Sequence, residues 1–385
     1  MVRSILVIYT LFKIMRIDKL HVYQVAMPLI SPWRTAYGED PNCHAVLVKA
    51  TSGEHEAWSE STPLCFGPTY MPETATSVFY NISEFFGPHV VGKDYDTADD
   101  LNKRLKIFKG NNFAKAAIEI CWWTLHSVMT NTPLHRILGG QSHDIVVGAD
   151  FGIQDSIDIL LGKIQQAVDS NFPRIKLKVA KGWDLDMLRA VKSTFPNVLF
   201  HIDCNSGYTL DDLPFFKAID NMGLAFIEQP LDYVDIIDHA KLARQIQTPI
   251  CLDETILSVK IAEQAIWEGA CQYINIKPGR VGGLTNAVAI HDLAQQEGVP
   301  VWVGGMIESA LGRAICVELA TLPNFTYPGD IFPSSDFYVQ DLAEPELVLQ
   351  SNNTFEPFTD PLPTPNVDRL SSLTVRSTTI EKLGT

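Results

Sequence analysis

The sequence RIKLKVA at residues 174–180 is followed at almost constant spacing by four similar runs: LFHIDCN (199–205), LAFIEQP (224–230), PICLDET (249–255) and YINIKPG (273–279). Each run is apolar and ends in one polar group; in order these are Lys178, Asp203, Glu228, Asp253 and Lys277, separated by 25, 25, 25 and 24 residues. Helix-like segments such as DLDMLRAVKSTF (184–195) lie between the runs. One strand, one helix and two short loops fill each step, so the repeat predicts an α/β fold with a parallel (β/α) barrel.

The five polar groups are expected to share one cavity, because parallel barrel strands all end at the same face. Three unpaired carboxylates in a small, partly dry space would repel one another unless a cation held them. A hard divalent ion with oxygen ligands is the simplest cation, and Mg²⁺ suits a site that leaves positions open for substrate. For any single carboxylate a helix cap or a surface ion pair is the alternative, but the strict period of Asp203, Glu228 and Asp253 favours a metal site.

Lys176 and Lys178 are two residues apart in one predicted strand, so both point to the same face. Burying two charged lysines inside a barrel is unfavourable, so we expect the pair to have a function. Close like charges disfavour each other's charged form, which predicts that one amine is neutral and can act as a base near pH 7.

The chain length suits one barrel of about 200 to 250 residues with a second, smaller domain. Alternating segments such as RIDKLHVYQVAM (16–27), followed by helical segments such as NFAKAAIEICWWTLHSV (112–128), predict an α+β capping domain over residues 15–135. The barrel is expected over residues 136–335, and the sequence does not place the tail at 336–385. Residues 1–14 are expected to be either non-native, from an upstream start codon, or a disordered extension, with Met15 as the natural beginning.

Two loops rich in proline, glycine and aromatic residues lie in the predicted capping domain, ISPWRTAYGEDPN (30–42) and STPLCFGPTYMPE (61–73). Beside a barrel mouth they are either lids that exclude water and contact substrate or ordinary turns with buried aromatic anchors.

The composition excludes two classes of partner. A formal net charge of −15 and a pI near 5.1 argue against nucleic acid, and no stretch of apolar residues is long enough to suggest a membrane span. The seven cysteines include no C-x-x-C pair, and most lie in apolar runs. This pattern predicts reduced core thiols in a cytoplasmic protein.

These strand-end motifs strongly resemble the muconate-lactonizing branch of the enolase superfamily. Within it, the o-succinylbenzoate synthase and N-succinylamino acid racemase group is similar over about Met15 to Asp330, in stretches such as RIKLKVAKGWD, DCNSGYTL, IEQPL, QTPICLDETI, NIKPGRVGGL, VWVGGMIESALGRA and LPNFTYPGD. The resemblance implies a modified TIM barrel with an N-terminal α+β capping domain. It also implies a small-molecule carboxylate substrate and a homo-oligomer.

For the site, the resemblance implies that Mg²⁺, which Mn²⁺ can replace, is held by Asp203, Glu228 and Asp253. Lys178 and Lys277 would remove or return a proton next to the substrate carboxylate, giving an enediolate, as is known of the superfamily. The remaining expected site residues contact the substrate or support these groups; they are Asp150, Lys176, Asn205, Glu254, Arg280, Gly305, Met306, Glu308 and Ser309.

The favoured activity is o-succinylbenzoate synthase, the dehydration of 2-succinyl-6-hydroxy-2,4-cyclohexadiene-1-carboxylate in menaquinone biosynthesis. The close alternative is N-succinylamino acid racemase, with both activities in one protein as a further option, because both reactions share the first proton abstraction. A dipeptide epimerase, a muconate cycloisomerase or a catalytically silent barrel is more remote. A silent barrel predicts the loss of at least one of the five strand-end groups, and none is lost.

The sequence departs from the group at three places. Asp150 stands where serine is common, and is expected either to repel an anionic substrate or to pair with a lysine such as Lys176. Asp336 stands where a basic residue is usual, and EAWSES (56–61) replaces G-W-G-E. Arg280, three residues after Lys277, is expected either to help Lys277 act as a base or to be an ordinary surface arginine.

Overall fold

The computed structural model describes residues 15–35, 38–64, 66–359 and 361–382, so the predictions for residues 1–14 and Cys65 lie outside it. The N-terminal part is an antiparallel sheet covered by helices. Its strand order is β17-β2-β3-β4, with β2 Lys19–Thr35, β3 Gly38–Ser52, β4 His55–Leu64 and β17 Thr374–Glu381. The helical elements are α1 Ala75–Asn81, a π-helical turn Ile82–Phe86, α2 Gly87–Val90, α3 Ala98–Leu105, α4 Asn112–Thr130 and α5 Leu134–Leu138.

The long helix α4 packs on β3 and β4 and covers one face of the sheet, while Cys43 of β3 contacts the Met306 carbonyl of the second part of the chain. Ser59 Oγ donates to the Ala117 carbonyl, and Ser61 Oγ donates to the Phe113 carbonyl, so two strand hydroxyls are satisfied by the helix backbone. The segment 30–42, predicted as a loop, mostly continues β2 and β3 instead. A short pair, β1 Met15–Arg16 with β5 Asp94–Tyr95, lies beside this layer.

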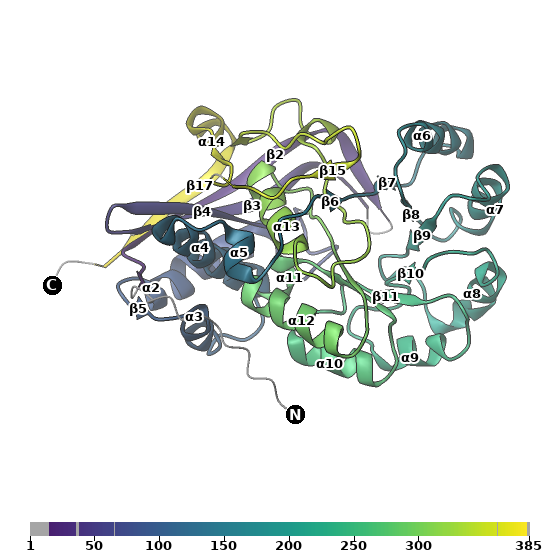
Figure 1. Cartoon of the computed structure of the whole chain (residues 1–385), viewed down its shortest axis with the longest axis horizontal. Coiled ribbons are helices and arrows are strands. Elements are labelled where there is room, and N and C mark those ends of the chain that lie inside the picture. The colour runs from purple at the N-terminus through teal and green to yellow at the C-terminus, as the bar shows by residue number, and fades with distance from the viewer. Residues whose placement is uncertain (1–14, 36–37, 65, 360, 383–385) are drawn as a thin grey trace.

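The second part is a parallel sheet of seven strands in the order β13-β12-β11-β10-β9-β8-β7, as the (βα) repeat predicts. The strands are β7 Ala149–Phe151, β8 Ile175–Lys178, β9 Phe200–Asp203, β10 Ile227–Glu228, β11 Ile250–Leu252, β12 Tyr273–Ile276 and β13 Val301–Val303. The helices are α6 Ile157–Asp169, α7 Leu185–Thr194, α8 Leu213–Ile219, α9 Ile237–Ala243, α10 Val259–Trp267, α11 Pro278–Val281, α12 Leu284–Gln296 and α13 Ala310–Ala320. Figure 1 shows α6 to α9 following one another around the side away from the N-terminal sheet.

The strand register sets the site. Lys178 is paired with Asp203, and Asp203 with Glu228, so these three strand ends lie side by side. Glu228 is paired with Cys251, which puts Asp253 two residues further along the next strand. The segment 324–330, NFTYPGD, makes only isolated parallel bridges, among them Val147 with Gly329 and Gly304 with Asp330. These bridges join the two edges of the sheet through one short segment.

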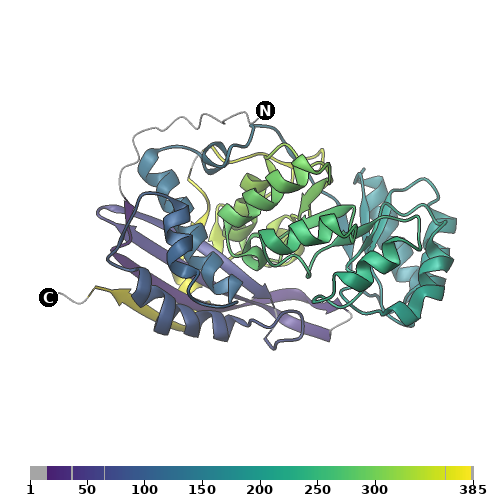
Figure 2. The same cartoon turned by 90° about the horizontal axis from the view of Figure 1, so that it is seen from below.

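The tail that the sequence does not place returns to the N-terminal sheet. Its pieces are β14 Ala343–Glu344, β15 Thr354–Phe355, β16 Thr364–Pro365 and α14 Val367–Leu373, before β17. Strand β17 then pairs antiparallel with β2, and Figure 2 shows the yellow β17 beside the purple strands of the N-terminal sheet. The apolar run at 145–153, IVVGADFGI, is split: β6 Ile145–Val146 pairs with β15 outside the seven-stranded sheet, and β7 joins that sheet.

Within the described part of the chain, no helix combines the length and apolar character that crossing a membrane requires. The six cysteines described there are all buried and unpaired, in keeping with the predicted core thiols.

Candidate active site

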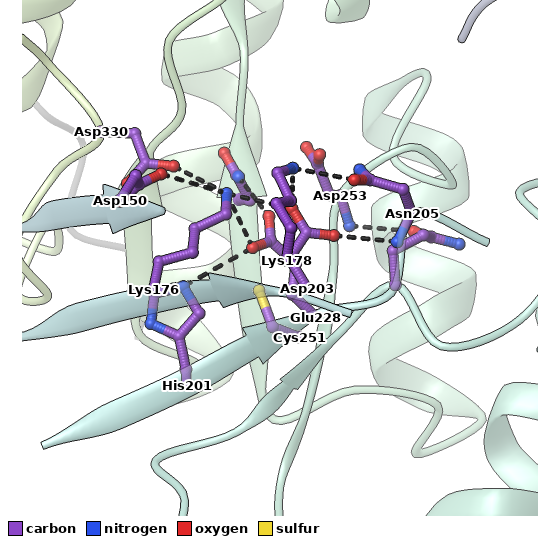
Figure 3. A network of polar contacts seen from close by, with 12 residues as sticks. Asp150, Lys176, Lys178, His201, Asp203, Asn205, Glu228, Cys251, Asp253 and Asp330 are labelled. Carbon is purple, nitrogen blue, oxygen red and sulfur yellow. Dashed lines mark hydrogen bonds and ion pairs between the residues drawn. The ribbon is translucent and has the colours of Figure 1, made fainter. Parts of the chain in front are cut away.

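Lys176 lies within the cluster of charged side chains at the strand ends (Figure 3). Its Nζ is 2.8 Å from Asp330 Oδ2, 3.0 Å from Glu228 Oε2, 3.1 Å from Asp203 Oδ2 and 3.7 Å from Asp150 Oδ2. Burial lowers the pKa of Lys176, but these carboxylates hold it well above its ordinary value. The prediction of a neutral amine in the lysine pair is therefore wrong for Lys176, because four carboxylates, three on other strands and Asp330 beyond them, outweigh one neighbouring lysine.

Lys178 occupies one side of the cluster. Its Nζ donates to Asp203 Oδ2 at 2.6 Å and to Asn205 Oδ1 at 2.8 Å. Asn205 is in turn held by Glu254, because its Nδ2 donates to Glu254 Oε1 at 2.9 Å. Burial, and then the charge of Asp253, raises the pKa of Glu254 to about 7. A nearly buried lysine is thus held between a strand-end carboxylate and an amide that a second acid orients.

Lys277 occupies another side, at the start of the short helix α11. Its Nζ donates to Asp253 Oδ2 at 2.9 Å and to the Tyr70 hydroxyl at 2.8 Å. Arg280 reaches the same two groups, with Nη1 2.5 Å from Asp253 Oδ1 and 3.4 Å from the Tyr70 hydroxyl. Arg280 is fully buried, so the surface alternative is wrong. Lys277 and Arg280 share one carboxylate and one phenol.

Asp150 is buried in a network around Arg174. The Arg174 guanidinium donates to both Asp150 and Asp330, and also to the carbonyl of Gly329 at 2.9 Å. Gly148 makes room for this, since a Cβ there would lie 2.1 Å from Arg174 Nε. Burial and the charge of Asp330 raise the pKa of Asp150 to about 6. Of the two expected roles, Asp150 takes the pairing with cations.

The three predicted metal ligands end neighbouring strands. Burial, and then Asp203, raises the pKa of Glu228 well above its ordinary value. Burial alone would raise the pKa of Asp203, but Lys178 and Lys176 hold it below its usual range. The same opposition lowers the pKa of Asp253, where burial is outweighed by Arg280 and Lys277.

As they stand, no three of the described Asp, Glu, His and Cys side chains converge closely enough to bind one metal ion. Lysine ammonium groups lie against the carboxylates and supply the positive charge. The donor set still fits a hard divalent ion, because it consists of buried carboxylate oxygens, and Glu228 Oε2 is approached by the Lys176 ammonium at 3.0 Å where a cation would lie. Binding an ion would require the ammonium groups to move away from Asp203 and Glu228.

The loop between β13 and α13 carries the remaining predicted residues. Gly305 packs against the Asp330 carbonyl, and Met306 and Glu308 line a small cavity of about 20 Å³ together with Lys277. Ser309 is turned toward the capping domain, where its backbone N–H and its hydroxyl both donate to Glu60. These four residues therefore lie beside the site, and Ser309 joins the two domains.

A larger cavity of about 840 Å³ opens beside Asp150, lined by Trp33 and Arg34 of the β2 end and by Asp336 and Phe337 of the tail. Arg34 is paired with Glu39 and Asp155, each at 2.7 Å. The first predicted lid segment thus borders a cavity at the edge of the barrel.

Two family models match the chain. Residues 17–139 match the mandelate racemase / muconate lactonizing enzyme N-terminal domain, and residues 160–357 match the enolase C-terminal domain-like model. The chain belongs to the enolase superfamily. The resemblance read from the strand-end motifs is confirmed.

Relatives within the enolase superfamily are similar over most of their length. The chain is 41% identical to an o-succinylbenzoate synthase from Geobacillus stearothermophilus, over 83% of this chain and 86% of that protein. It is 40% identical to an N-succinylamino acid racemase from an Amycolatopsis species, over 86% of this chain and 90% of that protein. A solved enolase superfamily member from Listeria innocua has a TM-score of 0.90 and 32% identity, covering 95% of this chain and 99% of that one.

Several side chains of this enolase superfamily site were not predicted from the sequence. Tyr70 comes from a loop of the capping domain, and Asn275 Nδ2 donates to Glu228 Oε1 at 2.7 Å. Arg174 and Asp330 anchor Lys176 and Asp150. A signal existed for Asn275, which lies two residues before Lys277 in the same strand and so shares its face. Tyr70 lies in the second predicted lid segment, 61–73, although the sequence did not single it out within that segment.

Proposed function

We propose that this chain is an o-succinylbenzoate synthase, which dehydrates 2-succinyl-6-hydroxy-2,4-cyclohexadiene-1-carboxylate. One observation carries the proposal: two buried lysines lie against different members of one carboxylate cluster, Lys178 at 2.6 Å from Asp203 and Lys277 at 2.9 Å from Asp253. The synthase relatives at 37–41% identity over most of the chain support the choice of reaction.

We assign the proton abstraction to Lys178. Its Nζ would take the proton next to the substrate carboxylate, and the resulting ammonium can return it to the departing hydroxyl group as water. Lys277, held by Asp253 and Tyr70, would stabilise the negative charge that develops on the substrate. Asn205 and Glu254 would keep Lys178 aimed at the substrate.

Members of this superfamily bind Mg²⁺, and Asp203, Glu228 and Asp253 are the residues that would hold it here. When bound, the ion offsets the second negative charge that proton removal places on the substrate carboxylate. Lys176 would then be released from Glu228 and Asp203 while Asp330 keeps its ammonium near the substrate. Mn²⁺ in place of Mg²⁺, a homo-oligomer and a cytoplasmic location also belong to this proposal.

The second candidate is N-succinylamino acid racemase. The observation that favours it is the pair of lysines held by separate carboxylates, because racemisation needs one base on each side of the substrate. The 40% identical racemase relative supports the same view. Both reactions begin with the same proton abstraction, so one protein can perform both.

The test is a steady-state assay of the purified protein with both substrates, before and after removal of divalent metal. We expect dehydration with the larger kcat/KM, loss of both activities in EDTA, and recovery with Mg²⁺ or Mn²⁺. A racemase kcat/KM well above that for dehydration would reverse the two candidates. Full activity in metal-free protein would contradict the assignment altogether.

A further inference from the structure

A histidine lies directly beneath the predicted metal ligands. His201 is two residues before Asp203 in β9, so its side chain points into the barrel one layer lower (Figure 3). The interior layers of such barrels are filled mainly by branched apolar side chains. A fully buried histidine at this level is therefore out of place unless it has a use.

A buried ring nitrogen without a hydrogen-bond partner faces the Glu228 carboxylate here. Within the described residues His201 Nε2 makes no hydrogen bond, and it lies 3.7 Å from Glu228 Oε2, the oxygen that Lys176 Nζ approaches to 3.0 Å. The other oxygen of the same carboxylate, Glu228 Oε1, accepts from Asn275 Nδ2 at 2.7 Å. An ordinary core histidine would have both ring nitrogens satisfied, and this one has only its far side satisfied.

The Glu228 carboxylate favours one tautomer of the ring. His201 Nδ1 is 2.9 Å from the Tyr327 hydroxyl, which can donate to it or accept from it. If the Tyr327 O–H donates to Nδ1, the ring proton sits on Nε2 and an N–H points at the Glu228 carboxylate. The opposite tautomer would set the Nε2 lone pair against that carboxylate.

Packing holds the ring in this orientation. The His201 ring lies 4.4 Å from that of Phe226, 5.4 Å from Trp302 and 5.5 Å from Tyr327, between centroids. Because aromatic rings close it in, His201 cannot turn toward another acceptor without a rearrangement of the barrel core.

We propose that His201 and Tyr327 form a positioning pair for Glu228, which together with Asn275 orients this carboxylate toward a divalent cation. In the tautomer with the proton on Nε2, the imidazole N–H and the Asn275 amide would fix the carboxylate without cancelling the charge that the ion needs. Outer partners of this kind change metal affinity about 10- to 100-fold when they are removed. The inference rests on the metal site of the proposed function.

The test is Mg²⁺ binding to metal-free protein by isothermal titration calorimetry. His201→Phe keeps a ring of similar size and removes the N–H, and Tyr327→Phe keeps the ring and removes the O–H. We expect His201→Phe to raise the Kd for Mg²⁺ by about tenfold or more, and Tyr327→Phe to raise it by less. The double variant should add little to His201→Phe, because Tyr327 acts through the histidine.

The matched control is Cys251→Ala, which disturbs the same layer two residues before Asp253. It should lower the melting temperature of the metal-free protein and leave the Kd for Mg²⁺ unchanged. A purely structural His201 would behave in the same way as this control.

An unchanged Kd in both His201→Phe and Tyr327→Phe, with normal binding by the unmodified protein, overturns this inference alone. If His201→Phe does not fold, Tyr327→Phe decides by itself. If the unmodified protein binds no Mg²⁺, the metal site of the proposed function fails and this inference fails with it.

Discussion

Replacing Lys176 with methionine should make the stability of the protein depend on divalent metal. Lys176 is 3% exposed, and its ammonium contacts Asp330, Glu228 and Asp203 within 3.1 Å. Methionine fills similar space without the charge. Four buried carboxylates, counting Asp150, would then share only the cations that remain nearby.

The magnitude follows from the loss of one buried partner. Removing a single member of a buried ion pair destabilises a protein by about 3–5 kcal/mol, because the remaining charge is left uncompensated. A bound Mg²⁺ would supply that charge, and at a free concentration 100 times its Kd a ligand adds about 2.7 kcal/mol to the stability of the folded state. The variant should bind Mg²⁺ more tightly than the unmodified protein and gain more stability from it, because no Lys176 ammonium competes at Glu228 and Asp203.

The assay is urea unfolding of both proteins, first without metal and then with saturating Mg²⁺. We expect a deficit of about 3–5 kcal/mol for Lys176→Met without metal, which shrinks when Mg²⁺ is added. The control is Lys181→Met, an exposed lysine paired with Asp212 at 2.9 Å, which should change stability by about 1 kcal/mol or less. A negligible deficit for Lys176→Met, or one that grows with Mg²⁺, would refute this reasoning.

Three further outcomes are expected. Burial raises the pKa of Glu60 from 4.5 to about 7, so the folded protein keeps a proton that the unfolded chain releases, and the contribution of Glu60 to stability falls as pH rises through this window. When urea unfolding is compared at about pH 5 and about pH 8, Glu60→Gln should lose less stability between the two pH values than the unmodified protein. An equal loss would contradict this expectation. Arg280→Gln leaves Lys277 as the nearest cation to Asp253, and the Asp253 charge then opposes release of the Lys277 proton. We therefore expect kcat/KM to fall more for racemisation than for dehydration. Equal losses would argue that Arg280 does not help Lys277 act as a base. Tyr70→Phe removes the hydroxyl that Lys277 contacts, and should lower kcat for both reactions with little change in melting temperature, whereas an unchanged kcat would exclude Tyr70 from the site.

The strand ends could be predicted because their signal is local and repeated. Each polar group ends an apolar run, and a constant spacing means that the same strand and helix recur. The register bears this out, since Lys178, Asp203 and Glu228 are neighbours across three strands. Spacing alone did not show that Asp253 lies two residues beyond the residue paired with Glu228.

The charge state of Lys176 could not be predicted from its neighbour in the same strand. Its pKa is decided by four carboxylates far from it in the sequence, at distances that sequence spacing does not give. Tyr70 is a similar case, because it meets Lys277 across 207 residues through the docking of one domain on the other. His201 was read as one residue of an apolar run, although its position two residues before Asp203 already placed it under the site.

The tail could not be placed because its strands are short and carry no period. Strand β17 is stabilised by pairing with β2, at the other end of the chain, and not by its own pattern. Arg280 was ambiguous because its burial depends on a four-residue helix, Pro278–Val281, which brings its side chain to Asp253.

The measurement that tests the central claim most directly is proton exchange in deuterated water. Each enantiomer of an N-succinylamino acid is incubated with the unmodified protein, with Lys178→Ala and with Lys277→Ala, and deuterium at the carbon next to the carboxylate is followed by NMR. We expect the unmodified protein to exchange both enantiomers, and each variant to lose exchange with one of them, a different one in each case. If either lysine variant still exchanged both enantiomers, the assignment of Lys178 and Lys277 as the two proton-transferring groups would be contradicted.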